Sequence, residues 1–159
     1  MWVYTHDGQE YIVSNIAKDI SHGFVQSAFG TSAMDWANPL APEDFQTMLD
    51  NSCVFGLLRK TSDSSSSTTQ IGIARLITDY VTLAYVTDVY IDPEYQGRGL
   101  ACFMMSCCRD VIGAMPAVRG TMLCTSRDAL IPFYERELGV RVHPQGENGF
   151  SILITPRNH

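Results

Sequence analysis

The alternation of apolar and polar residues divides the first third of the chain into short predicted elements. A run rich in β-branched residues at 11–14 predicts a strand. Apolar residues at helical spacing predict a helix over 19–29, and proline followed by acidic residues predicts a second helix that begins at Ala41. The segment between these helices, residues 30–40, is predicted to be a loop.

The rest of the chain predicts three further strands, then a helix, a strand, a helix and a C-terminal hairpin. The predicted strands are 54–58, 71–77, 82–92, 121–125, 140–143 and 150–155, and the predicted helices are 97–114 and 128–138. A strand-helix-strand unit implies a parallel pair of strands with a right-handed crossover. This order predicts one α+β domain over residues 1–159, with a mixed sheet of about six to seven strands and about four helices.

One segment of low complexity, residues 61–70, is rich in serine and threonine and separates two predicted strands. We interpret it as a flexible loop, with a phosphorylation tract as the alternative.

Composition and charge narrow the class of protein. The chain has 159 residues, 45% of them hydrophobic and 18% charged, as in ordinary globular proteins. A net charge of −6 without a basic stripe argues against nucleic acid and membrane surfaces as partners. Since the sequence also has no long apolar run and no signal-like start, we expect a cytoplasmic protein. The sequence leaves a homodimer open.

Cysteine and histidine give no sign of a disulfide framework or a metal centre. The five cysteines form no Cys-x-x-Cys pair, and we expect reduced, mostly buried thiols. The four histidines, at positions 6, 22, 143 and 159, lack metal-ligand spacing, so no metal is predicted.

The candidate ligand-binding segment is the glycine-rich turn that joins the predicted strand at 82–92 to the helix after it. Gly97 and Gly99 allow close approach of a ligand to the backbone. The amides at a helix start, together with its dipole, then favour a phosphate or pyrophosphate. The Gly-Lys-Ser/Thr of a Walker A loop and the three-glycine Rossmann spacing are both absent. The alternative is a plain glycine-rich turn at the start of a helix.

The run Gln96-Gly97-Arg98-Gly99-Leu100-Ala101 resembles the acetyl-coenzyme-A signature of the GNAT acetyltransferase superfamily. The resemblance extends from about residue 54 to about residue 140. Residues 84–91, followed by residues 95–100, look especially like a group of small uncharacterised GNAT-domain proteins. It implies a GNAT fold and acetyl-CoA as co-substrate. It also implies direct attack by a primary amine of a small molecule or peptide. The alternative is a GNAT-fold protein that binds coenzyme A or a partner without acetyl transfer.

The resemblance also implies which residues contact acetyl-CoA. Backbone groups of Val89 and Ile91 would pair with the pantetheine arm, and amides of residues 97–102 would hold the pyrophosphate. The implied set is Val89, Tyr90, Ile91, Gln96, Gly97, Arg98, Gly99, Leu100, Ala101 and Cys102. The Arg98 side chain would add positive charge, or would simply be solvated.

Two catalytic residues follow from the same resemblance. Tyr134 matches a helix tyrosine whose hydroxyl protonates the leaving thiolate, and packing of its ring is the alternative. Asp88, just before the cofactor strand segment, is the candidate base, and a structural strand carboxylate is the alternative. Asp35, Asp79 and the histidines are other possible proton acceptors.

The acceptor pocket of this fold is usually built by the first two helices and the loop between them. In this chain we expect Phe29, Asp35 and Trp36 to contact the amine, as an aromatic wall with a carboxylate. The alternative for most residues of this region is a place in the core.

Overall fold

A computed structural model describes residues 1–61, 67–142 and 151–154. The chain divides into two compact units, one formed by Met1–Arg75 and Asp88–Met104 and the other by Leu76–Thr87 and Met105–His159. Strands β4 (Thr68–Thr78) and β5 (Leu83–Ile91) and helix α3 (Leu100–Gly113) each contribute residues to both units.

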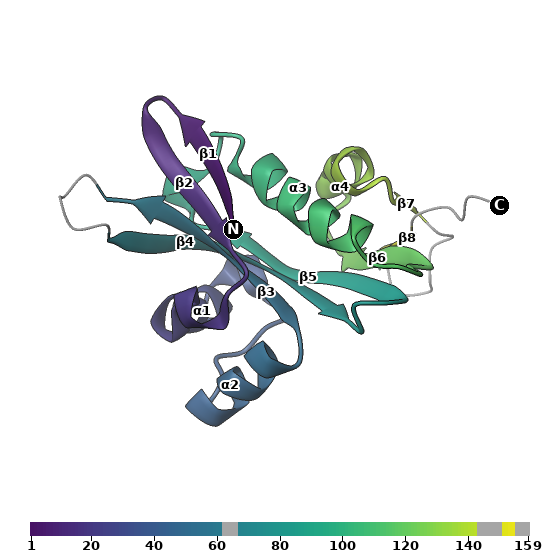
Figure 1. The fold of residues 1–159 in the computed structure, drawn as a ribbon, viewed down its shortest axis with the longest axis horizontal. Helices are drawn as coiled ribbons and strands as arrows, with labels where there is room; N and C mark the ends of the chain where they lie inside the picture. Colours follow the sequence, from purple (N-terminus) through teal and green to yellow (C-terminus); the bar gives the residue numbers. More distant parts are fainter. Residues whose placement is uncertain (62–66, 143–150, 155–159) are drawn as a thin grey trace. The chain divides into compact units, whose positions relative to one another are not determined.

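The strands of the first unit begin with an N-terminal hairpin that the sequence pattern did not predict (Figure 1). Strand β1 (Trp2–His6) pairs antiparallel with β2 (Gln9–Ser14), and β2 pairs antiparallel with β3 (Cys53–Lys60). In sheet order β4 and β5 follow β3. Residues 68–70, assigned above to the serine-rich loop, belong to β4, while residues 62–66 lie outside the described ranges.

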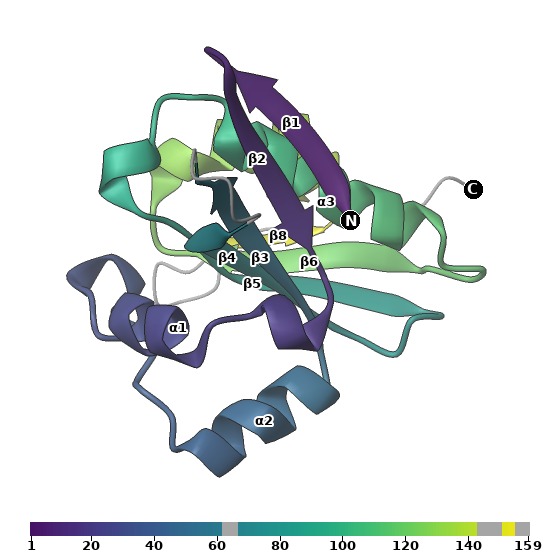
Figure 2. The same ribbon diagram turned by 60° about the vertical axis from the view of Figure 1, so that its left-hand side comes forward.

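Two helices of the first unit, α1 (His22–Phe29) and α2 (Pro42–Asp50), lie on the same side of its strands (Figure 2). Helix α1 begins later than predicted because Ser21 caps it, its hydroxyl accepting a hydrogen bond from the Phe24 amide at 3.2 Å. Helix α2 begins with Pro42 in its first turn, as predicted. Short 3-10 turns precede and follow α1, at Ala17–Asp19 and Ser32–Met34.

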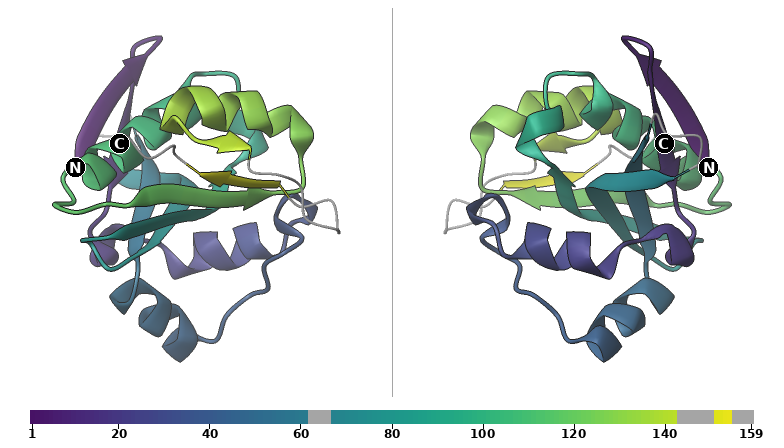
Figure 3. Two further views of the ribbon diagram at one scale, coloured as in Figure 1. Left: turned by 90° about the vertical axis from the view of Figure 1, so that its right-hand side faces the viewer. Right: turned by 90° about the vertical axis from the view of Figure 1, so that its left-hand side faces the viewer.

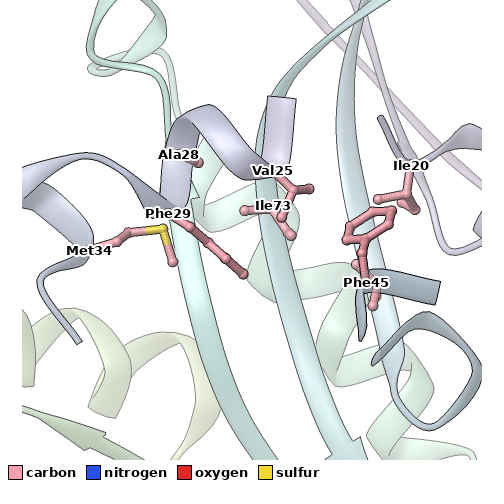
Figure 4. Close-up of a cluster of buried hydrophobic side chains, with 8 residues drawn as sticks. Ile20, Val25, Ala28, Phe29, Met34, Phe45 and Ile73 are labelled. Atoms are coloured by element: carbon pink, nitrogen blue, oxygen red, sulfur yellow. The ribbon is translucent and has the colours of Figure 1, made fainter. Parts of the chain in front are cut away.

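The helices are held to the strands by a hydrophobic cluster (Figure 4). Its buried members are Ile20, Val25, Ala28, Phe29, Met34, Phe45, Val54 and Ile73. Figure 4 shows Met34 beside Phe29, and Val25 beside Ile73 of β4. Full burial of one such side chain contributes about 1.5–3 kcal/mol, so this cluster fixes α1 firmly on the sheet.

The loop after α1 is fastened by one glutamine side chain. The Gln26 amide nitrogen donates to the Leu40 carbonyl, and the Leu40 amide donates back to the Gln26 side-chain oxygen at 2.6 Å. This reciprocal pair closes the segment that carries Asp35 and Trp36 into a defined loop.

The second unit contains the predicted parallel pair. β5 runs parallel to β6 (Gly120–Thr125), in a register from Leu83↔Gly120 to Val86↔Leu123. β8 (Ser151–Ile154) pairs antiparallel with β6, and β7 (Arg141–Val142) pairs antiparallel with β8. The predicted turn of the C-terminal hairpin, residues 144–149, lies outside the described ranges.

Helix α4 (Ile131–Leu138) lies beside the second part of α3 (Figure 3). Arg109 of α3 donates to the Glu137 carbonyl and lies 3.3 Å from its carboxylate. The predicted helix at 128–138 starts as a 3-10 turn, Asp128–Leu130, and ends at Gly139, which has a φ of +65°. The mixed sheet and four α-helices agree with the predicted fold class.

No helix within the described ranges is long and apolar enough to cross a bilayer. Over the same ranges, no three His, Cys, Asp or Glu side chains gather as metal ligands would. All five cysteines are present as thiols.

Candidate functional site

The glycine-rich turn is held against the end of strand β5 by side-chain hydrogen bonds. A 3-10 turn, Pro93–Tyr95, follows the strand, and the Asp92 carboxylate accepts from the Glu94 amide at 3.0 Å. The Gln96 side-chain amide donates to the Ile91 carbonyl at 3.0 Å. These contacts fix the turn before α3 begins at Leu100, whose buried side chain anchors the helix.

Both glycines of the turn adopt a left-handed backbone, with φ of +77° at Gly97 and +75° at Gly99. A Cβ added at Gly97 would meet nothing within 4 Å, whereas one at Gly99 would lie 3.0 Å from the Tyr4 hydroxyl oxygen. The Tyr4 hydroxyl also donates to the Arg98 carbonyl at 3.3 Å. The backbone conformation favours glycine at both positions, Gly99 is also packed closely against the Tyr4 side chain of β1, and the open side of the turn is at Gly97.

An open, glycine-lined turn at the start of a 14-residue helix fits a phosphate-bearing ligand. The residues present therefore fit the pyrophosphate group expected from the sequence. The ligand would be held by main-chain groups, because several of the predicted side chains are occupied elsewhere. Gln96 braces the strand end, and the Arg98 guanidinium donates to the Tyr11 hydroxyl at 3.2 Å and to the Glu94 carbonyl at 3.0 Å.

Strand β5 changes its facing direction at Asp88. Side chains at Ala84, Val86 and Asp88 are buried, but the next buried one is Ile91, so the alternation slips by one residue. Asp88 itself has a φ of +51°. The slip and the left-handed residue together are the features of a β-bulge, which re-aims the strand that follows it. The bulge therefore sets the direction of Val89, Tyr90 and Ile91.

Asp88 is buried and makes one short ion pair and one longer hydrogen bond. Its carboxylate accepts from the Arg75 Nε at 2.6 Å and from the Trp36 indole nitrogen at 3.4 Å. Only 6% of the Asp88 side chain and 19% of the Arg75 side chain are exposed. The ion pair with Arg75 and the link to Trp36 hold the bulge and the loop after α1 together.

The predicted acceptor residues separate into two groups. Trp36 is 54% exposed and Asp35 is also exposed, so both can meet a ligand. Phe29 belongs to the buried cluster under α1, which favours the core alternative for this residue. The Tyr90 side chain packs on the same cluster, with its ring 6.2 Å from that of Phe24.

Tyr134 lies in the second unit, on helix α4, and is 8% exposed. Burial raises the pKa of Tyr134 to about 12, the nearby Arg127 charge opposes this rise, and Cys108 adds to it. The hydroxyl therefore keeps its proton at neutral pH, as a proton donor must.

The sequence interpretation missed several side chains that shape this region. Tyr4 and Tyr11 of the N-terminal hairpin contact residue 98 of the turn, and Arg75 pairs with Asp88. The Asp7-Gly8 turn, with both residues at positive φ, was the available signal for that hairpin.

Comparison with known proteins identifies the family. A model of the acetyltransferase (GNAT) family matches residues 25–140. The chain belongs to this family. The match includes the bulged strand, the glycine-rich turn and the helix of Tyr134, so the resemblance stated from residues 96–101 is confirmed.

Individual proteins agree with the GNAT assignment. The chain is 30% identical over 158 residues to the Gibberella zeae protein named Putative acetyltransferase FG08082, covering 91% of this chain and 88% of the relative. A GNAT-family protein from Xanthomonas campestris pv. campestris is 28% identical with a TM-score of 0.60, over 79% of this chain and 81% of that one. Arabidopsis thaliana NAA60 has the same fold, with a TM-score of 0.68 at 13% identity over 93% of this chain and 99% of that one.

Proposed function

We propose that this GNAT protein is an acetyl-CoA-dependent N-acetyltransferase that acts on a primary amine of a small molecule or peptide. The observation that carries the proposal is the open glycine turn at Gly97, which follows a bulged strand and begins helix α3. Acetyl-CoA supplies an acetyl thioester, which a neutral amine attacks directly. NAA60 of similar fold has been crystallised with acetyl-CoA and with a bisubstrate analogue, which supports this choice of co-substrate.

The main chain supplies the coenzyme contacts in this proposal. Amides at residues 97–102 hold the pyrophosphate, where the helix dipole favours negative charge. Backbone groups of Val89 and Ile91 pair with the pantetheine arm like an added strand. The bulge at Asp88 supports this role, because it redirects the strand immediately before those two residues.

Asp88 acts in this proposal as a positioning residue. Its carboxylate is held by Arg75 and Trp36, so a role as base would require one of those contacts to open. Trp36 and Asp35 contact the amine in this proposal, which their exposure supports. A carboxylate beside an aromatic ring suits a cationic amine before it loses its proton.

Tyr134 donates the proton that the departing thiolate takes up. Its raised pKa keeps the phenol protonated through the physiological range. Two rotatable bonds and a buried ring hold the hydroxyl in one position, which a general acid needs.

An acetyl-transfer screen tests the function directly. We expect acetyl-CoA to raise the melting temperature, and free thiol to be released when the right amine is present among amines, polyamines, amino acids and peptides. Stabilisation by acetyl-CoA without thiol release from any acceptor would favour the binding-protein alternative. Neither stabilisation nor turnover would contradict the proposal.

Gly97→Ala is expected to weaken acetyl-CoA binding at least tenfold, about 1.4 kcal/mol, because the methyl group occupies the open side of a turn that already has a positive φ. Gly139→Ala is the matched control, since Gly139 also has a positive φ and open space around an added Cβ but lies at the end of α4. Calorimetric titration of both folded variants measures the difference. Equal affinities in the two variants would remove the turn from the coenzyme site.

A further inference from the structure

A polar pocket lies beside the β1–β2 turn of the first unit. Its volume is about 420 Å³, within the range of small-molecule pockets. It is lined by His6, Asp7, Gln9, Tyr11, Arg59 and Arg98. We call it the arginine pocket. The proposed function assigns its side chains no role, since the coenzyme contacts at residues 97–102 are made there by the main chain.

Aromatic hydroxyls and one ring hold the two arginines of this pocket in place. Arg59 donates to the Tyr95 hydroxyl at 3.0 Å, and Arg98 donates to the Tyr11 hydroxyl at 3.2 Å. Their guanidinium carbons lie 5.8 Å and 5.2 Å from the centre of the Tyr95 ring. The Tyr95 ring therefore attracts both guanidinium groups. This attraction partly offsets the repulsion between the two positive charges and holds them in place before a ligand binds.

Neither charge is balanced by a carboxylate within the described parts of the chain. Arg75, Arg109 and Arg136 all form ion pairs with Asp or Glu, but Arg59 and Arg98 do not. The Nε of Arg59 is buried and has no hydrogen-bond partner there. The pocket therefore carries two guanidinium charges that no carboxylate of the described residues neutralises.

We propose that the arginine pocket binds a phosphate group. Phosphate offers two negative charges and several acceptor oxygens, which match two guanidinium groups. The one carboxylate of the pocket, Asp7, is 91% exposed and lies 3.3 Å from His6, so it can remain in solvent when an anion enters. The volume exceeds that of a phosphate ion alone and leaves space for the organic part of an ester.

The phosphate has two possible sources, the ribose phosphate of coenzyme A or a separate phosphate compound. The first rests on the proposed function, whereas the binding of phosphate as such does not. Both sources place the same chemical group on Arg59 and Arg98.

Titration of inorganic phosphate into the full chain, at constant ionic strength set with chloride, tests the site. We expect saturable binding that Arg59→Gln weakens about tenfold or more, because a charged hydrogen bond and one net charge are lost. Arg59→Lys keeps the charge but not the planar donor pair, and should fall between the two. Arg119→Gln, which removes an exposed charge elsewhere, should bind like the unchanged protein.

Tyr95→Phe provides a second variant if Arg59→Gln fails to fold. It removes only the hydroxyl that accepts from Arg59, and should weaken phosphate binding severalfold. Phosphate binding that does not saturate, or that is equal in the Arg59, Tyr95 and Arg119 variants, would overturn the proposal.

Comparison of coenzyme A with dephospho-coenzyme A identifies the source. If Arg59→Gln weakens coenzyme A but not its dephospho form, the pocket takes the coenzyme phosphate. If the affinity for both forms is unchanged while phosphate binding is lost, the pocket takes a separate phosphate compound. A protein that binds phosphate at Arg59 but transfers no acetyl group keeps this inference and loses the proposed function.

Discussion

Tyr134→Phe is expected to lower kcat about 10²-fold while acetyl-CoA affinity stays within about twofold. The substitution removes the hydroxyl and keeps the buried ring, so packing on α4 changes little. The measurement is steady-state turnover with the best acceptor, together with coenzyme titration of both proteins. A variant with full activity would show that solvent supplies the proton, and an equal loss of binding and turnover would indicate a structural role.

The pH dependence gives an independent check on Tyr134. Its folded pKa of about 12 lies above the ordinary value of 10, so folding favours the protonated phenol. The corresponding stability is fully present below about pH 10 and is lost as the pH rises towards 12. We expect a tyrosine titration near pH 12 in the difference spectrum between the unchanged protein and Tyr134→Phe. A titration near pH 10 instead would show an exposed phenol.

Asp88→Asn is expected to reduce the free energy of unfolding by about 3–5 kcal/mol. The change leaves the Arg75 guanidinium largely buried without its ion-pair partner. Asparagine tolerates the left-handed backbone of this position, so the loss reports the charge and not the bulge. Denaturant unfolding measures it, and Arg75→Met combined with Asp88→Asn should lose less than the sum of the single changes.

Glu10→Gln is the matched control, because it breaks the exposed Lys60–Glu10 pair and should cost less than about 1 kcal/mol. The pH profile of the folded Asp88→Asn protein then separates two roles. A positioning residue leaves the acidic limb of the kcat profile where it was. Loss of that limb in the Asp88→Asn protein would indicate that Asp88 acts as the base.

Local patterns were sufficient to predict most of the fold. Gly97 and Gly99 marked a turn that needs positive φ, and the apolar spacing after Leu100 marked the helix that follows. The N-terminal hairpin was missed because the five residues Trp2–His6 alone are a weak strand signal. The Asp7-Gly8 turn that follows them, which would have indicated a hairpin, was overlooked.

Local patterns could not predict contacts between residues that are far apart in the sequence. Trp36 and Asp88 are 52 positions apart, and their hydrogen bond depends on how α1 packs and how its loop closes. Phe29 was expected to contact the amine because it belongs to the first of the two predicted pocket helices, but it lies in the same buried cluster as Val25, which favours the core alternative. The pairing of Arg75 with Asp88 depends on the β4–β5 register, which the sequence pattern left undefined.

The indole of Trp36 gives this protein a built-in optical reporter. The chain has two tryptophans, and the other, Trp2, lies with its ring 6.0 Å from that of Phe55. In a Trp2→Phe background, the fluorescence comes from an exposed ring whose N–H is tied to the Asp88 carboxylate. If the amine binds beside this loop, as proposed above, it will change both the polarity around the ring and that hydrogen bond. Acceptors could then be ranked by emission shift before any acetyl group has been transferred.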